Sequence, residues 1–357
     1  MINVTKPYLP SKDLYKKYVD EIWERAWLTN SGPIYLQLEK ELKLYFNNQF
    51  VSFCTNGTVA IQLALKALEI KGEVITTPFS YVATTNSILW ENCTPVFADI
   101  REDDFCIDAD RIEEKITEQT KAIMAVHVYG LPCDVEKIEN IARKHKLKVI
   151  YDAAHAFGVK YKGTSLLNYG DVSTCSFHST KLFHTIEGGA TICKDKALAE
   201  KLALYKVFGH LGDDYYSIGI NGKNSEFHAA MGLCILPHIN EIIEKRKSLS
   251  SVYDEYLNFG KKLFKPRSKH SFEYNYSYYP VVFTSEEKLL EVKKYLLENQ
   301  INTRRYFYPS LNTLSFLNYS KSTISEDISK RVLALPLYYD LEEVNVKKIA
   351  HFINQVI

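Results

Sequence analysis

The chain has 357 residues, of which 46% are hydrophobic and 24% charged, with 15 glycines and 11 prolines. These proportions are typical of a folded globular protein and exclude collagen-like and low-complexity architectures. The formal net charge of +1 and the absence of a long basic cluster argue against nucleic acid as a partner. No apolar run approaches the roughly 18–20 residues that cross a bilayer, so we expect a cytoplasmic protein without a membrane segment.

The seven cysteines are odd in number and scattered, and no two are spaced as CxxC. Neither a disulfide framework nor a structural zinc site is therefore predicted. The ten histidines include no HExxH pair. We expect no metal site.

Short apolar segments alternate with segments of helical periodicity between about residues 50 and 195. This alternation is typical of parallel strands joined by helices. The predicted strands are Val74–Thr77, Pro95–Ala98, Ala122–Val128, Val149–Tyr151, Val172–Ser176 and Gly189–Cys193. Helices are predicted over Val59–Leu68 and Val135–His145. We therefore predict an α/β domain with a mostly parallel sheet and helices on both faces.

The pattern changes after a predicted helix over Glu226–Arg246. The segments that follow are a charged helical run through Glu255, a β-rich Tyr276–Phe283, a helix Glu286–Gln300, a strand Ala334–Leu337 and a closing helix Val344–Ile357. This order predicts a smaller α+β domain. We place the large domain, with an N-terminal arm, at residues 1–240 and the small one at residues 241–357.

The first candidate for chemistry is the turn Thr55-Asn56-Gly57 at the start of a predicted helix. Free backbone N–H groups and the positive end of the helix dipole suit a phosphate group there. An ordinary N-cap by Asn56 or Thr55 is the alternative interpretation. The other phosphate motifs, GxGxxG and GxxxxGK[ST], are absent from the sequence.

The second candidate is Asp152, at the end of a predicted buried strand, with His155 three residues later. The carboxyl end of a parallel strand faces the crevice in which α/β proteins bind their ligands. Asp152 as a helix cap and His155 as a core histidine are the alternatives.

The third candidate is Lys181, which lies in a polar turn after the strand that ends at Ser176. A lone lysine is usually a surface residue, but a partly desolvated lysine can attack a carbonyl and form a Schiff base. A lysine, a carboxylate at a strand end and a phosphate-binding helix start together match what pyridoxal 5'-phosphate requires. The residues therefore predict a pyridoxal-phosphate enzyme.

Nearly the whole chain resembles the DegT/StrS family of nucleotide-sugar aminotransferases, a branch of the fold-type I pyridoxal-phosphate enzymes. The stretches that carry the resemblance are Trp27–Pro33, Thr55–Ala60, Thr77–Thr84, His127–Gly130, Asp152–Gly158, Ser176–Gly189 and Gly219–Ala230. The resemblance implies a large cofactor-binding domain and a smaller C-terminal one.

The resemblance also assigns roles to residues of this sequence. It implies three catalytic residues: Lys181 as the Schiff-base lysine and proton carrier, Asp152 as the partner of the pyridine nitrogen, and His155 near the phenolic oxygen. The other implied cofactor residues are Gly57, Thr58 and Ser176 at the phosphate, Tyr81 on the ring, and Asn221 at the neighbouring subunit's cofactor. A site shared in this way implies a homodimer.

Substrate-facing positions implied by the resemblance are Trp27, Thr29, Asn30, His184 and Tyr306, each of which is equally compatible with simple packing. The chain departs from the family pattern where Ile220, Gly222 and Lys223 replace two tyrosines and an arginine. Some relatives carry histidine in place of the lysine and dehydrate sugars. Because Lys181 is present, the resemblance implies transamination.

Within the family, the sequence is most similar to enzymes that aminate C4 of dTDP-4-keto-6-deoxyglucose, on the stretches Val4–Pro10, Trp27–Asn30 and Gly219–Leu233. With L-glutamate as donor, the expected product is dTDP-4-amino-4,6-dideoxyglucose for O-antigen or other lipopolysaccharide. Amination at C3 of a dTDP-3-keto sugar, or of a UDP-linked 4-keto sugar, is the alternative. A non-catalytic ligand sensor is a further alternative, but such a protein is expected to have lost Lys181 or Asp152.

Overall fold

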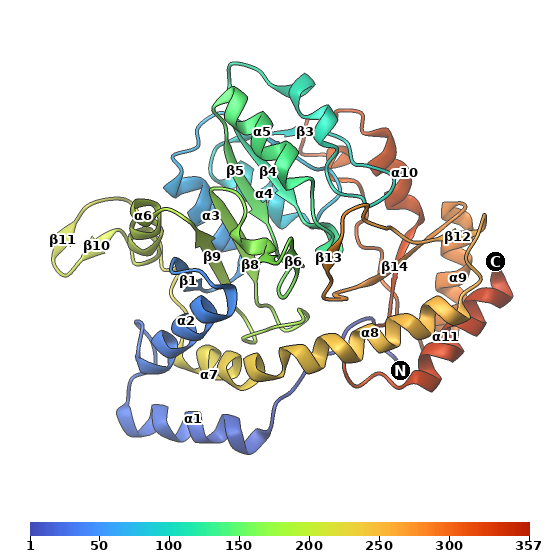
Figure 1. Ribbon diagram of the computed structural model, residues 1–357, viewed down its shortest axis with the longest axis horizontal. Helices are drawn as coiled ribbons and strands as arrows, with labels where there is room; N and C mark the ends of the chain where they lie inside the picture. The colour runs from blue at the N-terminus through green and yellow to red at the C-terminus, as the bar shows by residue number, and fades with distance from the viewer.

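Seven strands form the central sheet of the computed structural model, which describes residues 1–357 (Figure 1). In spatial order they are β1 (Val51–Cys54), β9 (Gly189–Cys193), β8 (Val172–Ser176), β5 (Lys148–Asp152), β4 (Thr120–Val126), β2 (Glu73–Thr76) and β3 (Thr94–Phe97). The strands from β8 to β3 run parallel, whereas β9 is antiparallel to both β8 and β1. The predicted α/β fold with a mostly parallel sheet is confirmed.

Both faces of the sheet are buried, because successive side chains of a strand point to opposite faces. In β4, Ala122 and Met124 pack in one core cluster, while Ile123 and Ala125 pack in another. The first cluster contains side chains of α3 (Gly57–Ala67), α4 (Ala83–Trp90) and α6 (Lys196–Lys206). The second contains side chains of α2 (Pro33–Phe46), α5 (Val135–His145) and α7 (Glu226–Ile235). None of the helices combines the length and apolar character that a membrane crossing requires.

The N-terminal residues, expected to form an arm, include the helices α1 (Lys12–Arg25) and α2. The buried Glu226 carboxylate holds the start of α2 by accepting the N–H groups of Ile34 and Tyr35 at 3.0 and 2.8 Å. A Cβ on Gly32 would lie 2.7 Å from that carboxylate carbon, so a side chain at this position would displace the carboxylate from the helix start. A contact across 191 residues thus fixes this helix.

The single helix predicted over Glu226–Arg246 is wrong. The structure has α7, a 3₁₀ turn Leu236–His238, and then α8 (Ile239–Tyr256). Pro237 lies in that turn, and proline lacks the N–H that a continuous helix needs. The sequence pattern alone did not reveal this interruption.

The C-terminal part has its own three-stranded antiparallel sheet, made of β12 (Leu263–Phe264), β14 (Tyr279–Phe283) and β15 (Val332–Leu335). Side chains of α8, α9 (Glu286–Glu298) and α11 (Glu343–Val356) pack with it in a separate core cluster. The predicted division between residues 240 and 241 falls at the start of the uninterrupted α8 and stays a prediction. The shorter strands are β6 (Lys160–Tyr161), β7 (Thr164–Ser165), β10 (His210–Leu211), β11 (Asp214–Tyr215) and β13 (Phe272–Glu273).

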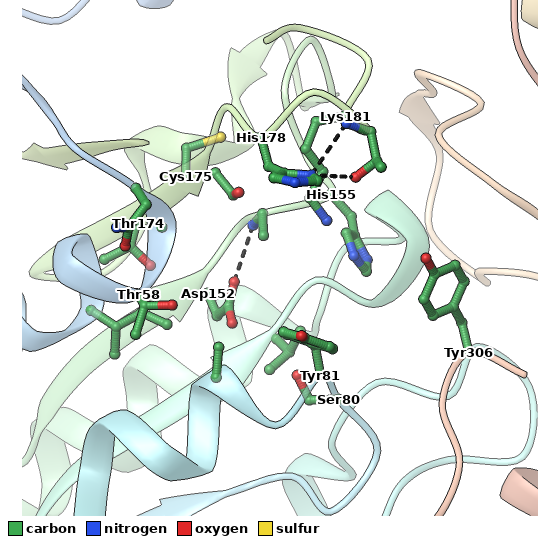
Figure 2. A pocket seen from close by; sticks show the side chains of 18 of the residues that line it. Thr58, Ser80, Tyr81, Asp152, His155, Thr174, Cys175, His178, Lys181 and Tyr306 are labelled. Carbon is green, nitrogen blue, oxygen red and sulfur yellow. Dashed lines mark hydrogen bonds between the residues drawn. The ribbon is translucent and has the colours of Figure 1, made fainter. Parts of the chain in front are cut away.

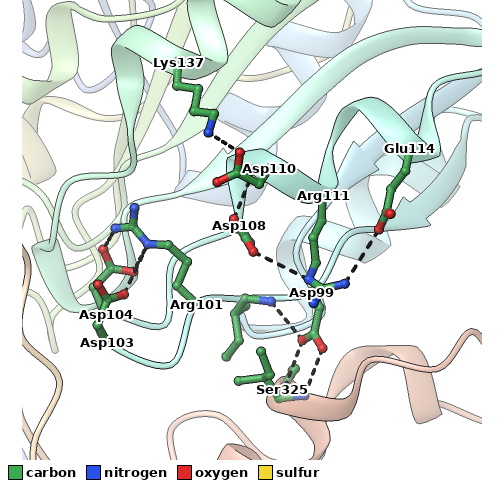
Figure 3. A network of polar contacts seen from close by, with 12 residues as sticks. Asp99, Arg101, Asp103, Asp104, Asp108, Asp110, Arg111, Glu114, Lys137 and Ser325 are labelled. Carbon is green, nitrogen blue, oxygen red and sulfur yellow. Dashed lines mark hydrogen bonds and ion pairs between the residues drawn. The ribbon is translucent and has the colours of Figure 1, made fainter.

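Asp99 joins the C-terminal part to the sheet (Figure 3). Its carboxylate accepts the N–H groups of Ile324 and Ser325 at 2.9 and 3.0 Å, at the first turn of α10 (Thr323–Arg331). A carboxylate at a helix N-terminus satisfies otherwise unpaired N–H groups and interacts favourably with the helix dipole. The Leu311 N–H donates to the Pro78 carbonyl nearby in the same joint, at 2.8 Å. These bonds hold C-terminal residues beside the carboxyl ends of the strands.

Candidate active site

A cavity of about 510 Å³ lies where β1, β2, β5 and β8 end (Figure 2). These strands run in one direction, so their carboxyl ends share one edge of the sheet. The predicted residues that line the cavity are Gly57, Thr58, Tyr81, Asp152, His155, Ser176, Lys181 and Tyr306. Side chains separated by up to about 250 positions therefore surround one space.

One end of the cavity is the start of α3. Asn56 caps this helix by accepting the Val59 N–H at 2.9 Å, while the N–H groups of Gly57 and Thr58 have no partner within the helix. A Cβ on Gly57 would lie 2.8 Å from the Ser176 Cβ, so glycine permits the helix start to approach the end of β8. The N-cap and the phosphate site, weighed as alternatives from the sequence, are compatible, because the cap leaves these donors free.

The Asp152 carboxylate is held from two sides at the end of β5. The Thr84 hydroxyl donates to one oxygen at 2.7 Å, and the Ala154 N–H donates to the other at 3.1 Å. The Ser80 hydroxyl lies 2.8 Å from that of Thr84 and extends the network. Asp152 is buried yet lines the cavity, so its carboxylate has a fixed orientation toward a ligand.

His155 faces the cavity as a neutral imidazole. Burial and the nearby Lys181 lower the pKa of His155 well below its ordinary value. Its Nδ1 atom accepts the backbone N–H of Tyr129 at 3.1 Å, so the proton of the neutral ring resides on Nε2. The ring also stacks against Phe307, with centroids 5.7 Å apart and planes 3° from parallel. The structure thus places an imidazole in the cavity with Nε2–H as its available donor.

Lys181 is half-buried in the polar turn after β8, and its Nζ atom lies 3.4 Å from the hydroxyl of Tyr278. Burial opposes the charge of the amine, but the neighbouring Tyr278 and Asp152 outweigh it and raise the pKa of Lys181. Tyr278 comes from the C-terminal part, 97 residues away in the chain. The amine is therefore positioned between the two parts of the molecule.

Two tyrosines border the cavity. Tyr81 precedes α4 and is 56% exposed, which leaves its ring face accessible to a planar ligand. Tyr306 comes from the C-terminal part, and its carbonyl accepts the hydroxyl of the buried Tyr129. Its ring also packs edge-on against Tyr278, with centroids 5.4 Å apart. Tyr306 is the one predicted substrate residue that lines this cavity.

The other predicted substrate residues do not line the cavity. His184 is buried, and its Nε2 atom lies 2.8 Å from the Tyr8 carbonyl. This ring nitrogen therefore helps to hold the N-terminal segment in place. The Trp27 indole N–H donates to the carbonyl of Thr29 at 2.6 Å, and Asn30 has left-handed backbone geometry. Asn221 also lies outside the cavity of its own chain. Their roles toward substrate, or toward a second subunit, stay predictions.

The structure adds residues that the sequence reasoning missed. Tyr278 and Arg304 line the cavity, and Tyr278 contacts Lys181. Thr84 is not part of the lining but donates to Asp152. Thr84 closes one of the family-like stretches and Arg304 lies two residues before Tyr306, so each was near a predicted residue. No local signal marks Tyr278, which is one tyrosine among several in a β-rich segment.

The donor set fits pyridoxal phosphate. Backbone N–H groups at the helix start suit its phosphate, a fixed carboxylate suits its pyridine nitrogen, and an amine suits its aldehyde. Because residue 57 is a glycine packed close to Ser176, no side chain at this position covers the N–H groups at the helix start. Within the described chain, no group of three or more His, Cys, Asp or Glu residues is arranged to hold a metal ion.

Comparisons with known proteins agree with this donor set. The model of the DegT/DnrJ/EryC1/StrS aminotransferase family matches residues 11–354. The dTDP-4-amino-4,6-dideoxy-D-glucose transaminase of Shigella dysenteriae is 40% identical over 364 residues, covering 99% of each chain. The GDP-perosamine synthase of Escherichia coli O157:H7 is 34% identical over 361 residues, covering 99% of this chain and 98% of that one. The crystal structure of DesI with its TDP-sugar product has a TM-score of 0.94 at 28% identity, covering 99% of this chain and 92% of that chain.

Proposed function

Because this chain belongs to the DegT/DnrJ/EryC1/StrS aminotransferase family and is a pyridoxal-phosphate-dependent transaminase, we propose that its acceptor is a nucleotide-linked keto sugar. In this proposal L-glutamate supplies the amino group, and C4 of dTDP-4-keto-6-deoxyglucose receives it. The product is dTDP-4-amino-4,6-dideoxyglucose. Full-length identity of 40% to transaminases named for that product, from Shigella dysenteriae and Escherichia coli, supports the choice of sugar.

The observation that carries the proposal is the placement of Lys181 and Asp152 in one cavity with the start of α3. Pyridoxal phosphate, when bound, supplies an electron-withdrawing ring that stabilises negative charge at the substrate carbon. The N–H groups of Gly57 and Thr58 and the Ser176 hydroxyl would hold its phosphate. Asp152, oriented by Thr84 and Ala154, would hold a proton at the pyridine nitrogen.

Lys181 is the residue that moves protons in this proposal. Its Nζ atom takes a proton from the α-carbon of the amino donor in the first half of the reaction and delivers one to the sugar carbon in the second. The Tyr278 hydroxyl lies 3.4 Å from Nζ and orients it. The Nε2–H group of His155 is directed to an acceptor oxygen in the cavity. His155 and Tyr278 are buried, which limits the access of bulk water to the proton transfers.

A homodimer with shared active sites is part of the same proposal. The segment around the β10–β11 hairpin exposes an unusual group of large apolar side chains: Phe208, Leu211, Tyr215, Tyr216, Ile218 and Ile220. Contiguous exposed apolar surface of this kind marks an interaction site. Asn221 directly follows this segment, and we propose that it reaches the cofactor phosphate of the partner subunit.

The substitution Lys181→Ala tests the catalytic assignment. We expect loss of transaminase turnover and of the yellow absorbance that a lysine-bound cofactor produces, while far-ultraviolet circular dichroism stays unchanged. The exposed Lys71, replaced by alanine, is the matched control and should keep both properties. Full turnover by the Lys181→Ala protein would contradict the proposal.

The sugar is tested separately. The enzyme, loaded with cofactor and supplied with L-glutamate, is incubated with dTDP-4-keto, dTDP-3-keto and UDP-4-keto sugars, and products are identified by mass spectrometry and NMR. We expect the highest kcat/KM for dTDP-4-keto-6-deoxyglucose. A higher value for the 3-keto or the UDP-linked sugar would replace this substrate by that one and leave the transaminase assignment intact.

A further inference from the structure

Two consecutive arginines at the cavity rim have opposite environments. The Arg305 guanidinium donates to the Glu286 carboxylate at 2.6 Å and to the Lys330 carbonyl at 3.0 Å, and it is 10% exposed. Arg304 lines the cavity, is exposed, and has neither a carboxylate partner nor a side-chain hydrogen bond. Arg305 is therefore occupied within the fold, and Arg304 is available to a ligand.

The backbone of Arg304 is fixed even though its side chain is free. It exchanges two hydrogen bonds with Ala334 of β15, at 3.3 and 2.8 Å. The guanidinium carbon lies 4.9 Å from the centre of the Tyr306 ring, which itself packs on Tyr278 beside Lys181. The rings of Tyr278 and Tyr306 therefore connect the Lys181 amine to the Arg304 guanidinium. A substrate that reacts beside Lys181 would extend along these rings toward Arg304.

The charges of the cavity leave Arg304 without an assigned partner. Asp152 is oriented by Thr84, Lys181 is the reactive amine, and Glu187 lies 3.5 Å from His178. Each substrate of the proposed reaction brings an anion, since the donor has carboxylates and the sugar nucleotide has a diphosphate. The whole chain carries a formal charge of only +1, so its overall field contributes little attraction. Recognition of either anion must come from local donors.

We propose that Arg304 is the anion-binding residue of this cavity and takes carboxylate or phosphoryl oxygens of a substrate. The inference rests on the proposed function, which supplies the two anionic substrates. A guanidinium presents its N–H groups in a planar fork that matches both anions in a two-point contact. Stacking on Tyr306 orients this fork without neutralising it.

The test uses the full chain loaded with cofactor and the variants Arg304→Gln and Arg304→Lys. One arm follows bleaching of the cofactor absorbance by L-glutamate, a second follows its return with the keto sugar, and a third measures binding of free dTDP by calorimetry. We expect Arg304→Gln to raise the half-saturating concentration roughly tenfold to a hundredfold in the arm or arms that report the bound anion, as for loss of a charged hydrogen bond. Arg304→Lys should recover part of the loss.

The arms also identify the anion. Weaker binding of dTDP together with weaker keto-sugar saturation assigns the diphosphate, whereas weaker glutamate saturation with dTDP binding unchanged assigns the carboxylate. The control Arg25→Gln removes an exposed arginine paired with Glu21 and should leave all three arms unchanged.

Unchanged values in all arms for Arg304→Gln would overturn the inference, as would an altered cofactor spectrum in Arg304→Lys, because that would indicate a structural role. Failure of the wild-type enzyme to respond to glutamate would instead count against the proposed function, and the dTDP arm would still test Arg304.

Discussion

Asp152 illustrates how a carboxylate proposed to act in catalysis depends on neighbours that do no chemistry themselves. Two hydrogen bonds, from Thr84 and Ala154, direct its oxygens within a buried setting. A hydrogen bond to a charged group contributes roughly 1.5–3 kcal/mol, so loss of one is measurable in the rate. The orientation of Asp152 therefore depends on Thr84 in α4 and on the backbone of Ala154, just after β5.

Thr84→Val removes the hydroxyl that donates to Asp152 at 2.7 Å and keeps the shape of the side chain. We expect kcat to fall about tenfold or more and the free energy of unfolding to fall by about 1–3 kcal/mol, and Thr84→Ser to restore most of both. Thr85 provides a matched control, because its buried hydroxyl has no hydrogen-bond partner. Steady-state kinetics of Thr85→Val should resemble the wild type, and an unaffected kcat in Thr84→Val would show that this hydrogen bond is unimportant.

His155 predicts a dependence of stability on pH. Its pKa is lowered in the folded protein, mainly by burial, so at mildly acidic pH the unfolded state binds more protons than the folded state. Stability is therefore lost as pH falls below the ordinary histidine pKa of about 6.5. His155→Gln should reduce this acid loss in urea denaturation measured between about pH 7 and pH 5. The loss should not vanish, because His184 and His228 also have lowered pKa values. The exposed His351 is the control, and His351→Gln should leave the pH profile unchanged.

At the scale of elements, the site is assembled at the ends of strands and the starts of helices. The helix α3 begins at Gly57 against the end of β8, and α10 begins on the carboxylate of Asp99. The second of these joints holds C-terminal residues next to the sheet without taking part in the site. We therefore expect the Asp99 contacts to contribute to the free energy of unfolding and not to the reaction rate.

Asp99→Ala leaves the N–H groups of Ile324 and Ser325 without their acceptor. We expect the free energy of unfolding to fall by about 1 kcal/mol, and by up to about 2, as for loss of a helix cap. Glu114, which lies 3.8 Å from Arg111 in an exposed pair, provides the control. Glu114→Ala should change stability by less than about 0.5 kcal/mol in the same urea titration, and an equal effect of the two substitutions would contradict the role given to Asp99.

At the scale of the whole molecule, the cavity lies between the large sheet and the C-terminal part, and the apolar hairpin segment lies away from both in Figure 1. Leu211 and Ile218 are 63% and 79% exposed there. Exposure of such side chains is unfavourable in water and is relieved by association.

The double substitution Leu211→Asp with Ile218→Asp should therefore convert the proposed dimer to monomer in light scattering. Activity should fall with it, because Asn221 would no longer reach a partner's cofactor. Val344, exposed on α11, provides the control, and Val344→Asp should leave the mass and the activity unchanged. A dimer that survives the double substitution would place the interface elsewhere.

Much of the fold and the site was predictable because local patterns encode it. Short, mostly apolar runs located the parallel strands β2, β3, β4, β5 and β8 and the antiparallel β9 to within about two residues. Polar residues directly after these runs, Asp152 and Lys181 among them, had to gather at one edge of the sheet. The cofactor follows from these local features, whereas the family and the reaction class follow from the resemblance of longer stretches of the sequence.

The tertiary structure alone decided which distant groups meet. The hydroxyl of Thr84 reaches Asp152 across 68 residues, and Tyr278 reaches Lys181 across 97. The same packing buried His184 within the fold and left Arg304, but not Arg305, free to face the cavity. Sequence periodicity reports which face of an element is apolar, whereas contacts between elements depend on how those faces pack in three dimensions. For that reason the sequence by itself determined the kind of chemistry, and the packing determined the neighbours that tune and direct it.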